Sequence, residues 1–109
     1  VELLNEKTRN ITRAINSLKE ELEAVDWYNQ RVEASSDEEL KAIMAHNRDE
    51  EIEHACMTLE WLRRNMDGWD EELKTYLFTS GPITSIEGQE QASDAPSNSG
   101  NGLNIGKMK

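Results

Sequence analysis

The fold depends first on residues 11–32, which read ITRAINSLKEELEAVDWYNQRV. Apolar side chains in this stretch follow one another at alternating steps of four and three residues, with one turn skipped before the last. In an α-helix, which has about 3.6 residues per turn, this spacing puts them on one side. No proline precedes Pro82, so we predict an unbroken first helix over about residues 3–34. The apolar stripe consists of Ile11, Ile15, Leu18, Leu22, Val25 and Val32.

The following residues predict a second helix that returns antiparallel to the first. Ser36 followed by Glu39 matches a capping box, whose two side chains accept hydrogen bonds from otherwise unpaired amides at a helix start. The helix is expected over about residues 37–66, with Gly68 as its C-terminal cap. One of its stripes has helical spacing but a polar middle, and a second stripe beside it is apolar. The first is Leu40, Met44, Asn47, Glu51, His54, Thr58 and Trp61; the second is Ile52, Ala55, Leu59 and Leu62.

The composition changes after Glu87. Before it, a short third helix is expected over about residues 70–78. After it, Gln, Ser, Asn, Gly, Asp and Pro dominate, and such a segment buries too little apolar surface to order itself. We therefore divide the chain into a helical hairpin domain (1–86), a flexible linker (87–102) and a partly apolar tail (103–109).

Composition limits the partners of this chain. Its 109 residues are 36% hydrophobic and 31% charged, which leaves little material for a core, so we expect a second copy or a partner to complete it. The net charge of −10 argues against nucleic acids and anionic membranes and favours cations as ligands. A single cysteine, Cys56, fits a reducing compartment such as the cytoplasm, and no apolar run is long enough to span a bilayer.

Glu51 and His54 form a Glu-x-x-His pair on one helical face, where the stripe calls for apolar side chains. A buried carboxylate is costly unless it is paired, hydrogen-bonded or bound to metal. On the first helix, Glu21 lies 14.5 residues before the turn centre at 35.5, and Glu51 lies 15.5 residues after it. At a rise of about 1.5 Å per residue, both lie about 22–23 Å from the turn. An antiparallel hairpin therefore predicts Glu21, Glu51 and His54 at one height.

These three side chains are half of the ligand set of a ferritin-like di-metal bundle. Such bundles use one Glu from each of two helices and a Glu-x-x-His from each of the other two. Two hairpins that dimerise into a four-helix bundle would supply four Glu and two His around two metal ions. Carboxylate and imidazole ligands suit iron, and also manganese or zinc. We predict a di-iron site shared between two chains, in which metal tightens self-association. The alternative is a surface helix pair with a coincidental Glu and His.

Other polar side chains near this set have weaker assignments. Tyr28, one heptad after Glu21, is placed either to hydrogen-bond a ligand carboxylate or to pack in the core. Glu20, Glu23 and Trp27 share another face, where the two carboxylates are placed to gather incoming Fe(II). Spacing alone favours a plain solvated acidic surface there.

A third group lies on an outward face of the second helix. His46, Glu50 and Glu53 follow one another at i, i+4 and i+7, a spacing that brings them to one side. They are placed to hold calcium or another divalent cation weakly, although spacing alone again favours a solvated surface.

Longer runs of the sequence resemble the encapsulated ferritin family, the ferritin-like cargo of encapsulin nanocompartments. The resemblance extends from about residue 11 to residue 86 and is far more specific than Glu-x-x-His. It implies a two-helix protomer that makes a four-helix ferroxidase site only at a dimer interface, and dimers that assemble into a ring-shaped decamer. The runs are EELEAVDWY (20–28), AHNRDEE (45–51), EHA (53–55), MTLEWLRR (57–64), YLF (76–78) and GPIT (81–84).

The resemblance also implies residue roles: iron ligands, a tyrosine that hydrogen-bonds near them, a group for iron access, and an outer metal position. The implied iron ligands are Glu21, Glu51 and His54, and the tyrosine is Tyr28. The group for iron access is Glu20, Glu23 and Trp27, and the outer metal position is His46, Glu50 and Glu53.

Residues 103–109 are similar to the short apolar peptides that dock cargo inside an encapsulin shell. Leu103 and Ile105 alternate, so an extended segment presents both to one groove. The bare sequence favours a frayed tail, and only the resemblance favours docking. It implies the encapsulin shell as a partner and its lumen as the location.

The resulting expectation is a ferroxidase that oxidises Fe(II) with dioxygen or peroxide and leaves iron storage to the shell. One rival is a helical dimerisation or adaptor module without redox metal, in which polar seam residues set register. A second rival keeps the di-metal site but performs peroxide reduction or uses manganese.

Overall fold

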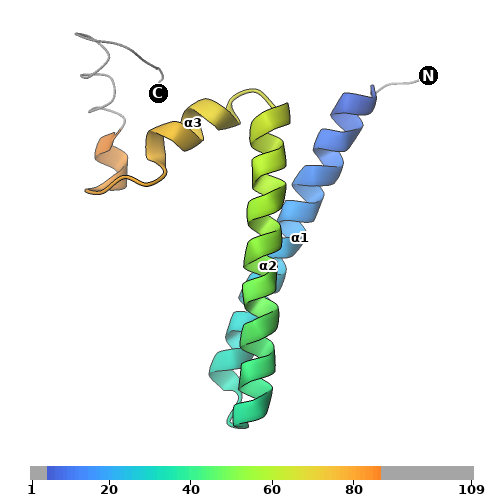
Figure 1. The fold of residues 1–109 in the computed structure, drawn as a ribbon, viewed down its shortest axis with the longest axis vertical. Helices are drawn as coiled ribbons and strands as arrows, with labels where there is room; N and C mark the ends of the chain where they lie inside the picture. The colour runs from blue at the N-terminus through green and yellow to red at the C-terminus, as the bar shows by residue number, and fades with distance from the viewer. Residues whose placement is uncertain (1–4, 87–109) are drawn as a thin grey trace. The chain divides into compact units, whose positions relative to one another are not determined.

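The computed structural model describes residues 5–86, which form three helices (Figure 1). These are α1 (Glu6–Ala34), α2 (Glu38–Asn65) and α3 (Trp69–Tyr76), and residues 83–86 add one further helical turn. The described part of the chain contains no strand, so the all-α prediction is confirmed.

Contacts divide the chain into a unit that ends at Met66 and a unit that begins at Asp67. The linker and tail predicted for 87–102 and 103–109 lie outside the described residues, so the predicted domain boundaries stay predictions. Residues 3–4, at the predicted start of the first helix, also lie outside them. None of the helices described here is long and apolar enough to cross a membrane.

α1 and α2 pack against each other as an antiparallel hairpin. They have 29 and 28 residues, so at about 1.5 Å per residue they are nearly equal in length. Side-chain hydrogen bonds between the helices include one from Arg48 to Asn29 Oδ1 at 3.0 Å and one from Thr58 to Glu21 Oε2 at 3.3 Å. The predicted two-helix hairpin is therefore confirmed.

The start of α2 differs from the capping box predicted at Ser36. The N-cap is Asp37, whose side chain accepts the backbone N–H of Leu40 at 2.9 Å. The backbone N–H of Asp37 itself donates to the Ser35 hydroxyl at 3.3 Å. The helix thus begins one residue later than the box requires, since the Asp37 carboxylate satisfies a first-turn amide and adds negative charge at the positive end of the helix dipole.

This assignment predicts different effects for two neighbouring alanine substitutions. Asp37→Ala should lower the free energy of unfolding by about 1 kcal/mol, because a first-turn amide loses its acceptor. Ser36→Ala, at the position that the sequence favoured, should change it by less than about 0.5 kcal/mol. Urea unfolding followed by circular dichroism at one protein concentration compares the two variants. Equal losses would contradict the assignment of Asp37 as the cap.

The ends of α2 and α3 also depart from the sequence prediction. The N–H of Met66 donates to Leu62 O at 2.8 Å and closes α2, whereas Gly68, with a φ of 102°, is the N-cap of α3. The predicted third helix over 70–78 instead begins at Trp69, after the N-cap Gly68. It ends at Tyr76, because Leu77 is extended and Phe78 has a φ of 62°. Phe78 is therefore not helical.

The hairpin buries few side chains completely. Within it, Ala55 and Leu62 are buried, and elsewhere in the described part only Ile86 joins them among the apolar residues. Half-buried residues of α1 and α2 instead recur at steps of three and four, which is the spacing of helices that pack along a seam. On α1 they include Ile11, Ala14, Leu18, Glu21, Val25, Tyr28 and Val32; on α2, Met44, Arg48, Glu51 and Thr58.

The seam on α2 is rotated from the predicted polar-centred stripe. Glu51 and Thr58 are half-buried as expected, but Leu40, His54 and Trp61 are exposed. The physical reason is that α2 turns the boundary between its two predicted stripes toward α1. Apolar side chains consequently remain exposed on the hairpin of the single chain. They include Ile15, Leu22, Leu40, Ile43, Ile52 and Met57.

Candidate metal centre

Glu21 carries a carboxylate oxygen that is withdrawn from solvent. Its Oε2 accepts the Thr58 hydroxyl, but its Oε1 is buried and has no hydrogen-bond donor among the residues that the structure describes. Leaving an anionic oxygen buried and unpaired is costly. A bound cation would remove that cost, and no alternative donor from the described part of α1 or α2 does so.

Glu51 and His54 lie together on α2, as their spacing predicted. His54 Nδ1 is 3.6 Å from Glu51 Oε1, which is too long for a hydrogen bond. The Glu51 side chain is 28% exposed and that of His54 is 46% exposed. Both groups are therefore accessible to a ligand and keep lone pairs for it.

The structure does not bring all three predicted ligands into one cluster within a single chain. The partner of Glu21 on α2 is Thr58, which follows Glu51 by seven residues and His54 by four. At about 1.5 Å per residue, the Thr58 backbone lies about 10 Å further along the helix than that of Glu51 and about 6 Å further than that of His54. Among residues 5–86, no group of three or more His, Cys, Asp or Glu side chains is placed to hold a metal ion.

The groups predicted to support the site lie on the same helix as Glu21. Tyr28 is half-buried and meets the Trp27 ring edge-on, with centroids 6.1 Å apart. Glu20 and Glu23 are exposed, and Trp27 is 55% exposed. Sequence reasoning missed Arg31, whose guanidinium carbon lies 3.8 Å from the centre of the Trp27 ring. The i, i+4 spacing of these two residues was the available signal for this cation–π contact.

The predicted outer position is only partly assembled in the single chain. His46 Nε2 lies 3.1 Å from Glu50 Oε2, and both side chains are more than half exposed. Glu53 is exposed, and the absence of a three-residue cluster in the described part applies to this set as well. A cation role for these three residues stays a prediction.

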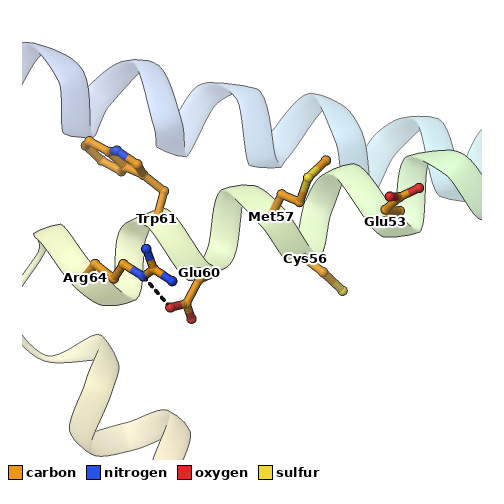
Figure 2. Close-up of a pocket in the computed structure, with 6 residues that line it drawn as sticks. All are labelled: Glu53, Cys56, Met57, Glu60, Trp61 and Arg64. Carbon is orange, nitrogen blue, oxygen red and sulfur yellow. Dashed lines mark hydrogen bonds and ion pairs between the residues drawn. The ribbon is translucent and has the colours of Figure 1, made fainter.

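Near the end of α2, two apolar side chains line open pockets. Figure 2 shows Met57 and Trp61 on the side of the helix nearer α1, and the exposed Cys56 directed away from it. Both apolar side chains also line a groove of about 490 Å³ with residues of α1, and Thr58 lies in that groove. The remaining lining residues of the two pockets are Asn10, Arg13, Ala14, Ser17, Glu53, Glu60 and Arg64.

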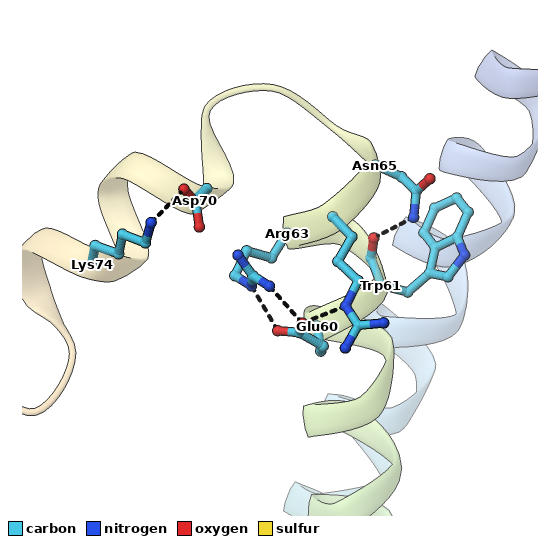
Figure 3. A network of polar contacts seen from close by, with 7 residues as sticks. Glu60, Trp61, Arg63, Asn65, Asp70 and Lys74 are labelled. Carbon is cyan, nitrogen blue, oxygen red and sulfur yellow. Dashed lines mark hydrogen bonds and ion pairs between the residues drawn. The ribbon is translucent and has the colours of Figure 1, made fainter.

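Glu60 is held by two arginines of its own helix (Figure 3). Arg63 donates to both carboxylate oxygens at 2.7 Å, and Arg64 Nε donates to Oε2 at 2.6 Å. These hydrogen bonds, Arg63 first, lower the pKa of Glu60 from 4.5 to about 2. The cluster lies at the C-terminal end of α2, where positive side chains are favourable.

A lowered pKa makes the contribution of this carboxylate to stability dependent on pH. The contribution is fully present above pH 4.5 and is lost as the pH falls through about 2, because the unfolded chain binds the proton first. We expect wild type to have a higher Tm than Glu60→Gln above pH 4.5, with the difference narrowing toward pH 2. Thermal unfolding across that range measures it, and a difference independent of pH would refute this account.

Known proteins are similar in sequence to this chain over most of its length. Residues 1–80 match the family model described as EncFtn-like. A curated protein of Thermotoga maritima, named ferritin-like protein, is 59% identical over 105 residues, which cover 96% of this chain and 90% of that protein. A curated protein of Rhodospirillum rubrum, named encapsulated ferritin-like protein, is 58% identical over 118 residues, which cover 100% of this chain and 84% of that protein.

A solved structure extends the similarity to three dimensions. The crystal structure of a protein from Nitrosomonas europaea is 66% identical in sequence and superposes with a TM-score of 0.71. The superposition covers 73% of this chain and 89% of that one.

Proposed function

This chain belongs to the EncFtn-like family, and from that premise we propose that it is a ferroxidase that oxidises Fe(II) to Fe(III) at a di-iron site shared between two copies. The observation that carries the proposal is the buried Oε1 of Glu21, an anionic oxygen without a donor in the described part of the chain. Such an atom suits a cation, and carboxylates with an imidazole suit iron among cations.

Fe(II) is the substrate, and the chain supplies its ligands. In a dimer, Glu21, Glu51 and His54 of each copy amount to four carboxylates and two imidazoles, the set that di-iron bundles use for two metal ions. The bound iron pair gives up one electron per ion to dioxygen or peroxide. Glu51 neutralises positive charge while His54 presents a neutral nitrogen, and Tyr28 is placed to hydrogen-bond a ligand carboxylate.

Assembly of two copies is supported by the apolar side chains that the hairpin leaves exposed. Ile15, Leu22 and Ile52 are 41%, 56% and 44% exposed, so these apolar side chains meet solvent in the single chain. A homodimer that forms a four-helix bundle would cover such side chains. In this proposal the dimers assemble further into a ring-shaped homodecamer, as the family resemblance implies.

The remaining roles follow the same proposal. Fe(II) reaches the site past Glu20, Glu23 and Trp27, and calcium or another divalent cation occupies the outer position formed by His46, Glu50 and Glu53. The name of the Rhodospirillum rubrum relative supports encapsulation. We place this chain in the lumen of an encapsulin shell in the cytoplasm, docked through residues 103–109, with the shell storing the oxidised iron.

Anaerobic addition of Fe(II) followed by air tests the proposal. A ferroxidase oxidises Fe(II) rapidly and saturates at one ion per chain. An adaptor module gives no saturable oxidation, and that result would overturn the proposal. A parallel addition of peroxide in place of air identifies which of the two oxidants accepts the electrons.

A further inference from the structure

We propose that Thr58 is a positioning residue that sets the orientation of the Glu21 carboxylate for metal binding. The proposal rests on the proposed function, because it assigns Glu21 as an iron ligand. Its starting point is the hydroxyl of Thr58, which donates to Glu21 Oε2 at 3.3 Å across the hairpin. Thr58 itself was visible in the sequence only as a polar interruption of the second helix.

The hydrogen bond makes the two oxygens of Glu21 unequal. Oε2 has a donor, whereas Oε1 is buried without one among the described residues. The last side-chain torsion angle of a glutamate has a broad distribution. A glutamate carboxylate without a hydrogen bond therefore samples many orientations. The Thr58 hydroxyl removes that freedom and leaves Oε1 as the oxygen available to a cation.

The acceptor of this hydrogen bond differs from that of an ordinary threonine within a helix. Within a helix, a threonine hydroxyl commonly bonds a backbone carbonyl one turn earlier, as Thr75 does with Glu71 O at 3.0 Å in α3. Thr58 instead reaches a residue that is 37 positions away in the sequence. The contact therefore ties α2 to a proposed ligand on α1.

Groups that orient metal ligands typically contribute 10–100-fold to metal affinity, in round numbers. Thr58→Val keeps the shape of the side chain and removes only the donor. We expect it to weaken Co(II) binding about 10–100-fold and to change the visible absorption bands of bound Co(II), which report ligand geometry. Thr58→Ser keeps the hydroxyl and should restore both the affinity and the spectrum to near those of wild type.

The experiment titrates Co(II) alone into the full chain, anaerobically, and follows its visible absorption. Thr75→Val is the matched control, because it removes a threonine hydroxyl that bonds only its own backbone in the contacts described above, and it should bind Co(II) as wild type does. Circular dichroism checks that each variant folds, and Thr58→Ala, which cannot introduce a clash, replaces the valine variant if that one is unfolded.

The outcomes separate this inference from the function on which it rests. If folded Thr58→Val binds Co(II) with the affinity and spectrum of wild type, Thr58 has no positioning role and the inference is wrong. If Thr58→Val is impaired and Thr58→Ser is not, but wild type fails to oxidise Fe(II), the positioning role stands while the ferroxidase proposal fails. Absence of Co(II) binding by wild type overturns the positioning role, whereas the ferroxidase proposal is decided separately by Fe(II) oxidation.

Discussion

Glu51→Gln will abolish saturable Fe(II) oxidation while leaving the hairpin folded. Glutamine has the shape of glutamate but no negative charge, so it cannot neutralise Fe(II) or bridge two ions. The expected loss in rate exceeds about 100-fold, because groups that merely orient ligands already contribute about 10–100-fold. His54→Ala and Glu21→Gln should fall in the same range. Stopped-flow absorbance of Fe(III), recorded when anaerobic protein with Fe(II) meets oxygenated buffer, measures the rate.

A matched control separates the loss of a ligand from the loss of a charge. Glu33→Gln removes one carboxylate from an exposed position near the end of α1 and should leave the saturable rate unchanged. Saturable oxidation of Fe(II) by Glu51→Gln or His54→Ala at the wild-type rate would show that these residues are not the ligands. A loss in Glu33→Gln as large as in Glu51→Gln would show that net charge, rather than coordination, controls the reaction.

The parts of this fold that could be predicted are those set by short-range spacing. The amphipathic spacing of residues 11–32 predicted α1 and its end at residue 34, although the helix begins at Glu6, after the extended N-cap Asn5, rather than near residue 3. The family resemblance is confirmed by the match over residues 1–80. The contact between Glu51 and His54 follows directly from their i, i+3 spacing. The N-cap was missed by one residue, because Ser36 and Asp37 are both good capping residues and sequence alone does not rank them.

What could not be predicted depends on how two helices meet. α2 carries two adjacent stripes, and only packing against α1 determines which boundary turns inward, leaving His54 exposed and Thr58 on the seam. The contact of Thr58 with Glu21 joins residues 37 positions apart, so no local pattern contains it. The same holds for the buried state of Glu21 Oε1, which is a consequence of that packing.

Metal will strengthen self-association of this chain. Within residues 5–86 a single copy gathers no cluster of three or more metal-binding side chains. In the proposed site, a metal ion gains its full ligand set only when two copies meet. A ligand that binds the dimer alone stabilises it by about 2.7 kcal/mol when its concentration is 100 times its dissociation constant. That corresponds to about a 100-fold fall in the dimer dissociation constant for each metal ion bound. Sedimentation velocity with and without anaerobic Fe(II), over a range of protein concentrations, measures the shift.

The same linkage works in the reverse direction, which gives the prediction a second, independent readout. Dilution that separates the dimer should weaken metal binding, so that affinity per chain falls as protein concentration falls. In Glu51→Gln, association should become insensitive to metal, whereas Glu33→Gln should respond as wild type does. Two iron ions held by one monomer, at a dilution where no dimer sediments, would mean that one chain completes the site alone. The exposed apolar side chains of the hairpin would then need a different partner to cover them.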